Sequence, residues 1–311
     1  MRSMAQPYHK SDSLWKNIRR NQYVYLFILI SLSFYVLFCY VPMYGIVLAF
    51  KNYNASKGIL GSPFIGLKHY ADLFREPAFW RAFSNTVVIS FSRIVFEFPA
   101  PIILALLLNE LRIKKYRKVL QTIYTFPNFL SWVIVSSVAL NILGSEGLLN
   151  NLLMAAGIEK QQFLANKALF RPILYITDIW KSSGWTSIIY LAAITSISMD
   201  LYEAAIIDGA NRFQKMVHVT LPCIRSVIVI MLLLSVGSTM NAGFDQIFNM
   251  YNPTVEKVAD ILDTYIYRIT FQTSGDFGFS TAVGLFKSVI NFGLLFGFDR
   301  LAKKFGESGL F

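Results

Sequence analysis

Charged side chains inside otherwise apolar runs are the groups in this sequence best placed to do chemistry. Arg93 and Glu97 lie four residues apart, and Asp178 and Lys181 lie three apart. A helix brings residues at these spacings onto one face, so each pair could neutralise itself. A charge within an apolar span is costly and often functional. The pairs therefore either stabilise the structure or line a water-filled pathway for a polar solute.

Motifs for catalysis or metal binding are missing from the sequence. It contains no nucleophile elbow, HExxH motif, kinase motif set or GxxxxGK[ST] phosphate loop. His9, His69 and His218 fall in three separate segments without metal-ligand spacing, and Cys39 and Cys223 form no CxxC pair. We therefore expect no metal site, no disulfide framework and no ATP hydrolysis by this chain itself.

The composition indicates a membrane protein. Of 311 residues, 55% are hydrophobic and 15% are charged, whereas a soluble domain carries about 25% charged residues. Disorder is excluded as well, because it requires low hydrophobicity. A net charge of +11 would suggest nucleic acid in a soluble protein, but membrane proteins gather Lys and Arg on cytoplasmic loops. We therefore expect a lipid bilayer as partner, and no nucleic acid.

Six apolar runs are long enough, or nearly so, to cross a bilayer. The first, 23–50, has 28 uncharged residues and is too long for a signal peptide; Pro42 and Gly45 are expected to bend or end it. The remaining predicted spans are 82–108, 119–143, 172–196, 227–250 and 280–298.

The basic residues set the predicted orientation. Arg112, Lys114, Lys115, Arg117 and Lys118 crowd one short loop, which the positive-inside rule places in the cytoplasm. Both termini are then cytoplasmic. The predicted organisation is an N-terminal cytoplasmic segment 1–22, one all-α polytopic domain of six transmembrane helices at 23–298, and a cytoplasmic tail 299–311. Short helices are expected at 67–74 and 150–157 in the outer segments.

The loop of about 197–226, between the fourth and fifth predicted spans, carries the most specific pattern. Glu203, Ala204 and Ala205 favour a helix, and Gly209 is a natural helix stop. Pro222 suits the first turn of the next helix. Small alanine side chains allow another surface to approach closely. The local physics therefore predicts an ordered helix–turn–helix on the cytoplasmic side, without naming its partner.

This pattern resembles the signature loop of bacterial ABC-importer permeases. The match runs Glu203-Ala204-Ala205, three residues, Gly209, nine residues, Val219, one residue, Leu221-Pro222, with Val219 where Ile is commoner. Asp208-Gly209-Ala210 and Phe213-Gln214 resemble the binding-protein-dependent, maltose-type (type I) carbohydrate branch. The segment Pro42-Met43-Tyr44-Gly45 is similar to the first outer boundary of a subgroup for complex oligosaccharides, and Gly66-Leu67-Lys68-His69-Tyr70 and Asn85-Thr86 resemble carbohydrate permeases.

The resemblance implies a mechanism and a set of partners. The loop would form a cytoplasmic coupling helix between helices 4 and 5, using Glu203, Ala204, Ala205, Asp208, Gly209, Ala210, Leu221 and Pro222. It would dock on a separate ABC ATPase, present in two copies, which binds ATP and Mg²⁺; this chain would hold no cofactor. A second, related permease would complete a heterodimer, and an extracytoplasmic sugar-binding protein would deliver an oligosaccharide. The complex would lie in the bacterial plasma (inner) membrane.

A sugar path would need hydrogen-bonding groups beside aromatic rings, because sugars are polyols. Asn241 and Asp245, four apart in the fifth predicted span, could supply the polar groups. Trp180, Trp185 and Tyr190 could supply the rings, or they could be membrane-interface anchors.

One further charged residue lies in the last predicted span, and two other classes of membrane protein are alternatives to the importer. Lys287 is expected to snorkel or to be paired.

A secondary transporter or channel for a polar solute would need no ATPase, and it predicts repeats with interrupted half-helices, which we do not find in the sequence. A membrane-embedded enzyme would need an acidic cluster; Asp260 and Asp263 are close in sequence, but a solvated face explains them better.

Overall fold

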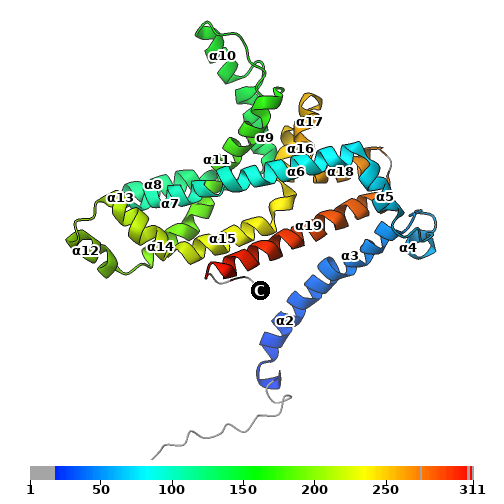
Figure 1. Cartoon of the computed structure of the whole chain (residues 1–311), viewed down its shortest axis with the longest axis horizontal. Helices are drawn as coiled ribbons and strands as arrows, with labels where there is room; N and C mark the ends of the chain where they lie inside the picture. The colour runs from blue at the N-terminus through cyan, green and yellow to red at the C-terminus, as the bar shows by residue number, and fades with distance from the viewer. Residues whose placement is uncertain (1–17, 274, 307–308, 310–311) are drawn as a thin grey trace, which may run out of the picture.

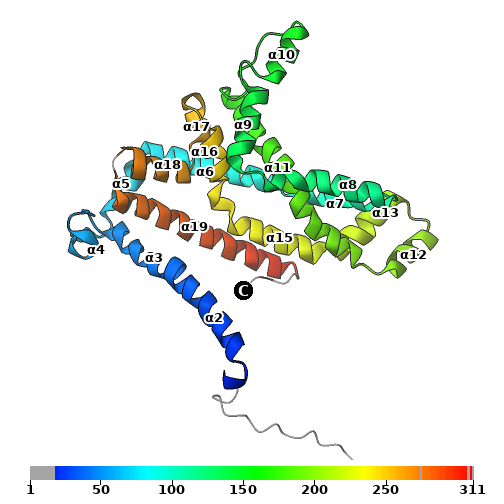
Figure 2. The ribbon, with the colours of Figure 1, turned by 180° about the vertical axis from the view of Figure 1, so that it is seen from behind.

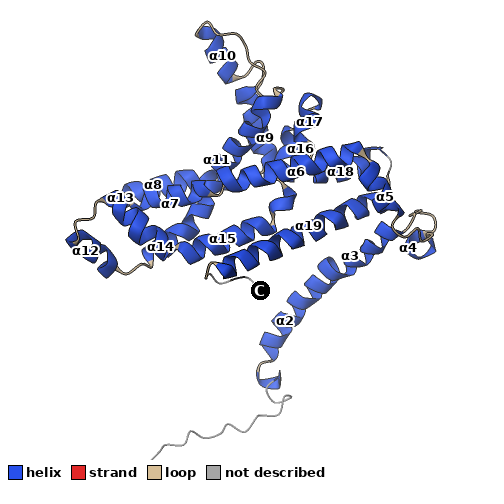
Figure 3. Ribbon diagram, in the orientation of Figure 1, coloured by secondary structure: helices blue, strands red, loops and turns tan. Residues whose placement is uncertain are grey.

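The computed structural model describes residues 18–273, 275–306 and 309, and these residues are helical apart from turns and one isolated antiparallel bridge between Lys51 and Phe64 (Figures 1 and 3). The α-helices are α2 Gln22–Tyr35, α3 Val41–Met43, α4 Gly58–Gly61, α5 Lys68–Arg75, α6 Pro77–Phe96, α7 Pro99–Asn109, α8 Lys114–Thr125, α9 Trp132–Leu143, α10 Leu148–Ala155, α11 Lys167–Thr195, α12 Met199–Ile207, α13 Arg212–Lys215, α14 Leu221–Cys223, α15 Arg225–Gly237, α16 Phe244–Met250, α17 Glu256–Ala259, α18 Leu262–Tyr267 and α19 Phe277–Lys304. The all-α prediction is confirmed.

Several helices are long and apolar enough to cross a membrane. In the described residues there are four such stretches, Gln22–Phe50, Pro77–Asn109, Trp132–Ala155 and Phe277–Lys304. Two bent pairs raise the number to six: α11 with α12, and Arg212–Cys223 with α15. A count of six transmembrane helices, with both termini inside, remains a prediction.

The first span is continuous and stands apart from the bundle. It runs from Gln22 to Phe50 with none of its most apolar window buried, and Figure 1 shows the rod of α2 and α3 diverging from the other helices. The chain does not end its helix at Pro42: the winding widens to a π-helix at Val36–Tyr40 and continues through α3, which holds Pro42. At Tyr44 the winding tightens to a 3₁₀-helix that ends at Phe50.

Three predicted spans are interrupted. The run 82–108 is divided between α6 and α7, which are separated by Glu97 and Phe98 ahead of Pro99. The run 119–143 is wrong as one span: α8 ends at Thr125, a 3₁₀ turn holds Pro127, and Ser131 caps α9. Each break lies beside a proline, which lacks a backbone donor for the preceding turn. The first break is slight, because Phe98 keeps helical φ and ψ and Pro77–Asn109 remains one apolar stretch; at the second, the chain leaves the helix at Leu130 and Ser131.

The run 227–250 is also wrong as one helix. Ala242 and Gly243 both have positive φ, 48° and 75°, a conformation incompatible with continuing a right-handed helix. The break separates α15 from α16. The sixth span is longer than predicted, because α19 ends at Lys304 and so includes residues assigned to the cytoplasmic tail.

The long helix α11 organises the centre of the bundle. It packs on α7, α8 and α15. Gly184 makes the close approach to α8 possible, since a Cβ there would overlap the Tyr124 carbonyl. Away from this centre, α5 and α10 confirm the two short helices expected at 67–74 and 150–157. Figures 1 and 2 place α12 at one end of the molecule and α4 and α5 at the opposite end.

Candidate coupling helix and translocation path

The helix α12 contains the Glu-Ala-Ala motif. Ser198 caps its start by accepting a hydrogen bond from the Asp200 N–H at 3.3 Å. Gly209, with φ of +77°, ends it. The Gly209 N–H donates to the Ile206 carbonyl at 3.0 Å, and the Ala210 N–H donates to the Ala205 carbonyl at 2.9 Å. A left-handed residue is needed at this turn, and glycine adopts that conformation without strain.

The chain after Gly209 is fixed by a second cap. Asn211 and Gln214 exchange side-chain and backbone hydrogen bonds at 2.8 and 2.9 Å, which starts α13. A hydrogen bond of 2.9 Å between the hydroxyls of Tyr202 and Thr220 ties α12 to the return segment. The axis bends by 72° between α11 and α12, and by 64° before α15. The segment 199–223 therefore lies across the ends of two long helices.

The segment of α12 and α13 exposes several apolar side chains beside acidic ones. Ile207 is 86% exposed, and Met199, Leu201, Ile206 and Phe213 are exposed as well. Single exposed apolar residues are ordinary, but a contiguous group marks a contact surface. Of the predicted coupling residues, Glu203, Ala204, Asp208, Gly209 and Pro222 are exposed, while Ala205, Ala210 and Leu221 are half-buried. The exposed residues of this set are accessible to a docking partner.

A cavity of about 340 Å³ lies among α6, α7, α11 and α15. Its polar wall holds Arg93, Glu97 and Asp178. The Arg93 Nη1 atom lies 3.2 Å from a Glu97 oxygen and 3.7 Å from an Asp178 oxygen. The predicted Arg93–Glu97 pair is confirmed. The predicted Asp178–Lys181 pair is wrong, because Asp178 faces the cavity and Arg93.

Lys181 points elsewhere. Its Nζ atom donates to the Asn128 carbonyl at 3.0 Å and lies 5.4 Å from the centre of the Trp132 ring. That carbonyl is available because the third predicted span breaks at residues 126–131. This break was not predicted from the sequence, and it gives Lys181 a partner other than Asp178. A cation over an aromatic face is an attractive contact.

Arg93 also contacts the residues at the break in the fifth predicted span. Its guanidinium donates to the Gln246 side-chain oxygen, and a Cβ at Gly243 would collide with it. Gln246 is fully buried and donates to the Leu174 carbonyl and the Thr177 hydroxyl, both at 2.8 Å. One arginine therefore holds α6, α11 and α16 together.

The residues predicted to line a sugar path are not gathered in one place. Asn241 and Asp245 are exposed but lie on either side of the break, so they do not share a helix face. Trp180 and Trp185 are half-exposed, and Trp180 borders a separate apolar cavity. Tyr190 is buried against the 340 Å³ cavity, and its hydroxyl has no hydrogen-bond partner among the described residues.

Lys287 is paired, which is one of the two alternatives predicted from the sequence. Its Nζ atom lies 2.7 and 2.8 Å from the two carboxylate oxygens of Asp263 and 2.9 Å from the Asn241 side-chain oxygen. This contact joins α19, the start of α18 and the break after α15. Asp263 is consequently a pairing residue and not part of a solvated acidic face.

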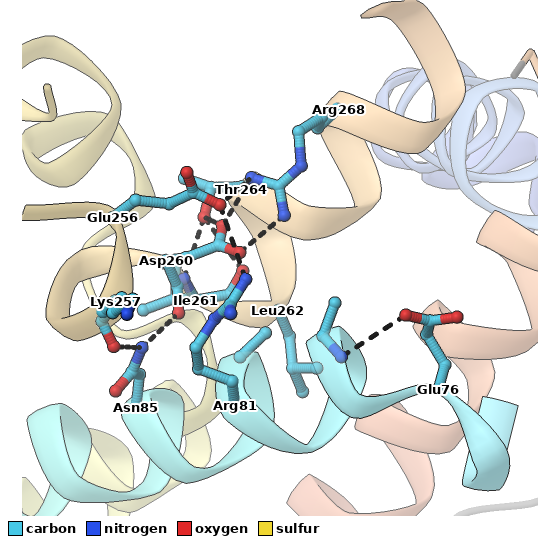
Figure 4. A network of polar contacts seen from close by, with 12 residues as sticks. Glu76, Arg81, Asn85, Glu256, Lys257, Asp260, Ile261, Leu262, Thr264 and Arg268 are labelled. Atoms are coloured by element: carbon cyan, nitrogen blue, oxygen red, sulfur yellow. Dashed lines mark hydrogen bonds and ion pairs between the residues drawn. The ribbon is translucent and has the colours of Figure 1, made fainter. Parts of the chain in front are cut away.

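Asp260 is buried, contrary to the expectation of a solvated face. Figure 4 shows its carboxylate held by Arg268 and Thr264. The same figure shows Asn85 on α6 donating to the Asp260 carbonyl at 2.9 Å and to the Lys257 carbonyl at 3.1 Å. A charge buried to this degree must be paired. The network fastens segment 256–268 to α6.

The ring of Tyr265 contacts a member of this network, Arg268. The Arg268 guanidinium is 5.7 Å from the ring centre. Burial raises the pKa of Tyr265 to about 12, so its hydroxyl stays neutral near pH 7.

The described residues hold no group of three His, Cys, Asp or Glu side chains with metal-site geometry. His69 contacts the Lys51 carbonyl at 3.0 Å and His218 contacts the Gln214 carbonyl at 3.1 Å. His9 lies outside the described residues, as do residues 1–17 of the predicted N-terminal segment.

Sequence reasoning missed Gln246 and Arg171, and it assigned no structural role to Asn85. Arg171 donates to the Asn85 side chain at 2.8 Å and to the Val258 carbonyl at 3.1 Å. Each of these residues is an isolated polar group beside or within an apolar run, which was the available signal. Their partners are up to 175 residues distant in sequence, so spacing alone could not find them.

The fold and the site define a helical membrane protein with an exposed helix, α12, between two bends of the chain and a polar interior cavity. Residues 97–307 match the model of the family described as binding-protein-dependent transport system inner membrane component. The chain belongs to this family. It is a multi-pass permease and not an enzyme.

Individual relatives agree with this assignment. The polygalacturonan/rhamnogalacturonan transport system permease protein YteP of Bacillus subtilis (strain 168) is 47% identical over 97% of this chain and 94% of its own length. Protein LplB of the same strain is 42% identical over 97% of this chain and 95% of its own length. A chain in the crystal structure of a bacterial alginate ABC transporter, in complex with alginate pentasaccharide-bound periplasmic protein, is 37% identical, with a TM-score of 0.88 over 96% of this chain and 100% of that chain.

The family assignment, and not helix continuity, excludes the rival transporter class. The structure does contain interrupted spans, which the sequence pattern does not reveal, so interruption by itself does not separate a secondary transporter from an ABC permease. The match to the family model over two thirds of the chain separates the two classes.

Proposed function

We propose that this chain is one permease of a heterodimeric, ATP-driven importer of oligosaccharides. The observation that carries the proposal is the exposed helix α12, which holds Glu203 and ends at Gly209 between two sharp bends of the chain. Such a helix is poorly explained as part of this chain's own core. It is well explained as the element through which a separate ATPase moves the long helices.

The coupling mechanism follows from how α12 is held. The Tyr202–Thr220 hydrogen bond and the caps at Ser198 and Asn211 make the segment a stiff unit. Force applied to the exposed face of α12 is therefore passed to α11 and α15. Closure of two ATPase subunits, which bind ATP with Mg²⁺, would tilt these helices and switch the permease between inward-facing and outward-facing states.

The translocation path in this proposal includes the 340 Å³ cavity. Its walls carry Ser182, Thr186, Ser235 and Ser238 together with the charged group at Arg93. Hydroxyls and a paired guanidinium give hydrogen bonds to a polyol, and the ring of Tyr190 closes one wall. Asn241 borders an adjoining cavity of about 290 Å³ and stays a candidate contact. Trp180, Trp185 and Asp245 stay candidates on the surfaces where a partner permease would sit.

The substrate class is supported by the names of the relatives. YteP is named for polygalacturonan and rhamnogalacturonan, and the alginate transporter was captured with a binding protein carrying an alginate pentasaccharide. We therefore propose oligosaccharides of plant or algal polysaccharides as cargo, delivered by an extracytoplasmic binding protein. A second, related permease completes the path, as in the heterodimer expected from the sequence.

The test is uptake by the native complex. A complex isolated through a tag on this chain is reconstituted in proteoliposomes with its binding protein, and uptake of galacturonate, alginate and neutral oligosaccharides is measured with and without ATP. The proposal expects a co-purifying ATPase and ATP-dependent uptake of at least one of these oligosaccharides. Uptake that needs no ATP, or no co-purifying ATPase, would contradict it.

A further inference from the structure

Four aromatic rings of α16, α18 and the residues after α18 contact one another in series. Phe244 and Phe248 on α16 are stacked with centroids 5.3 Å apart and an angle of 29° between their planes. Phe248 meets Tyr267 of α18 at 4.8 Å, and Tyr267 meets Phe271 at 5.3 Å. Phe248 and Phe271 are exposed, and the other two are half-buried. We refer to these four residues as the aromatic strip.

The strip begins where the interior cavity ends. The 290 Å³ cavity shares Arg93, Glu97, Ser235 and Ser238 with the larger one, and its far wall is Asn241, Ala242 and Gly243. The next residue along the chain is Phe244. The break that interrupts the fifth predicted span thus turns the chain out of the cavity and directly onto the strip.

The face that carries the strip is not suited to lipid. Beside Phe244 and Phe248, α16 presents the carboxylate of Asp245 and the amide of Asn249. Asn241, three residues before Phe244, and Asp263, four residues before Tyr267, both accept hydrogen bonds from Lys287. Exposed ionised groups are costly against hydrocarbon and mark water-filled cavities or polar partners. The buried face of α16, with Gln246, Ile247 and Met250, packs inward.

Rings beside hydrogen-bonding groups fit one kind of ligand. A pyranose has an apolar face of C–H groups and a rim of hydroxyls, so it needs an aromatic surface next to polar side chains. The strip supplies consecutive ring contacts, and Asp245 and Asn249 supply acceptors and donors along its edge. The stacked pair Phe292 and Phe296 on α19 is exposed as well, but neither ring lines the 290 Å³ cavity, and the charged neighbour of Phe296 is a cation, Arg300.

We propose that the aromatic strip is a binding site for the outer sugar units of an oligosaccharide, while its leading units occupy the cavity. The site receives a chain of pyranose rings by stacking on Phe248 and Tyr267 and by hydrogen bonds to Asp245 and Asn249. This inference rests on the proposed function, because it assigns a further position on the same path. It predicts that the strip matters for long substrates and not for short ones.

The first experiment measures access and protection. In a Cys39→Ser, Cys223→Ser background, which removes the two exposed thiols of the chain, Phe248→Cys is labelled with a water-soluble maleimide in the complete complex without ATP. The matched control is Phe292→Cys. We expect labelling at position 248 that slows at least fivefold in the presence of galacturonate or alginate pentasaccharide, and no slowing at position 292. No labelling at 248, or equal slowing at both positions, would overturn the proposal.

The second experiment compares substrate lengths. Phe248→Leu retains an apolar side chain but loses the ring, and Phe248→Trp retains a ring. With Leu, the pentasaccharide concentration for half-maximal uptake should rise roughly tenfold, equivalent to about 1.4 kcal/mol, while uptake of the disaccharide of the same sugar stays unchanged. With Trp, both should match wild type. If Phe248→Leu affected uptake of the pentasaccharide and the disaccharide equally, the proposed sugar site on the aromatic strip would be refuted, but the proposed importer function would not. If the wild type took up no oligosaccharide, both proposals would be refuted.

Discussion

Arg268 donates two hydrogen bonds to the buried carboxylate of Asp260, at 2.6 and 3.1 Å from its two terminal nitrogens. Asp260 is 0% exposed, so removing it takes away both close hydrogen bonds of the guanidinium and leaves only the Glu256 carboxylate, 3.9 Å away. Asp260→Ala should cost about 3 kcal/mol, the lower end for breaking a buried ion pair, because Arg268 keeps partial exposure. Thermal unfolding of the purified complex should shift by roughly 5 °C.

A surface carboxylate provides the control for this shift. Asp72 on α5 is exposed, and Asp72→Ala should leave the unfolding temperature within error of wild type. Equal shifts for the two variants would mean that the Asp260 network does not stabilise the segment 256–268.

The exposed end of α12 should be required for ATPase binding. Ile207 is 86% exposed and Leu60, in the outer segment, is 82% exposed, so a charge at either position disturbs no core. Ile207→Asp should reduce the ATPase that co-purifies with this chain by at least roughly tenfold, because an apolar contact is replaced by a desolvated charge. Leu60→Asp should leave it unchanged. Co-purification at the wild-type ratio for Ile207→Asp would argue against docking through α12.

Arg93 should be needed for both stability and transport. In Arg93→Ala the carboxylates of Glu97 and Asp178 face the cavity without their shared cation, and Gln246 loses a donor. We expect uptake reduced more than tenfold, with a lower unfolding temperature, since an unpaired buried charge is costly. Arg93→Lys keeps the charge but not the planar, two-pronged guanidinium, so its unfolding temperature should fall less than that of Arg93→Ala. Wild-type stability of Arg93→Ala would contradict the structural part of this role.

Lys287 and Asp263 should behave as one unit. Lys287→Ala and Asp263→Ala each leave a charge without its partner, and the double variant leaves none. The stability losses should therefore be non-additive, with a coupling of about 1–2 kcal/mol in a double-mutant cycle. The measurement is the unfolding temperature of the four complexes. Additive losses would show that the contact contributes no interaction energy.

The helical class, the family and the helix 199–207 with its glycine end could be predicted from the sequence, because each rests on local information. Apolar runs indicate membrane helices, and the backbone favours glycine at 209 and accepts proline at 222. The Arg93–Glu97 pair was accessible for the same reason, since both residues lie within five positions.

The interruptions and the long-range partners were not accessible. Ala242 is an ordinary helix former, yet it adopts a positive φ because Arg93 and Gln246 hold the chain at the break. Hydropathy averages over such a position and predicts one continuous helix. Lys181 shows the same effect, because its partner carbonyl at Asn128 exists only where α8 and α9 separate. Tertiary contacts decided these positions against local propensity.

Gly209 offers the sharpest test of the coupling account. It has φ of +77°, and Gly157, at the end of α10, has φ of +76°; a Cβ at either position meets nothing within 4 Å. Valine therefore imposes the same backbone strain at both sites, without steric overlap. Only Gly209 frames the docking helix.

The most direct measurement is ATPase activity of the complex in nanodiscs, with its binding protein and a panel of oligosaccharides. We predict that one oligosaccharide stimulates hydrolysis in the wild type and in Gly157→Val, and that Gly209→Val lowers this stimulation at least roughly tenfold while the protein still inserts into the membrane. Activity indifferent to every oligosaccharide, or equal stimulation in the two glycine variants, would contradict the assignment of α12 as the coupling element of an oligosaccharide importer.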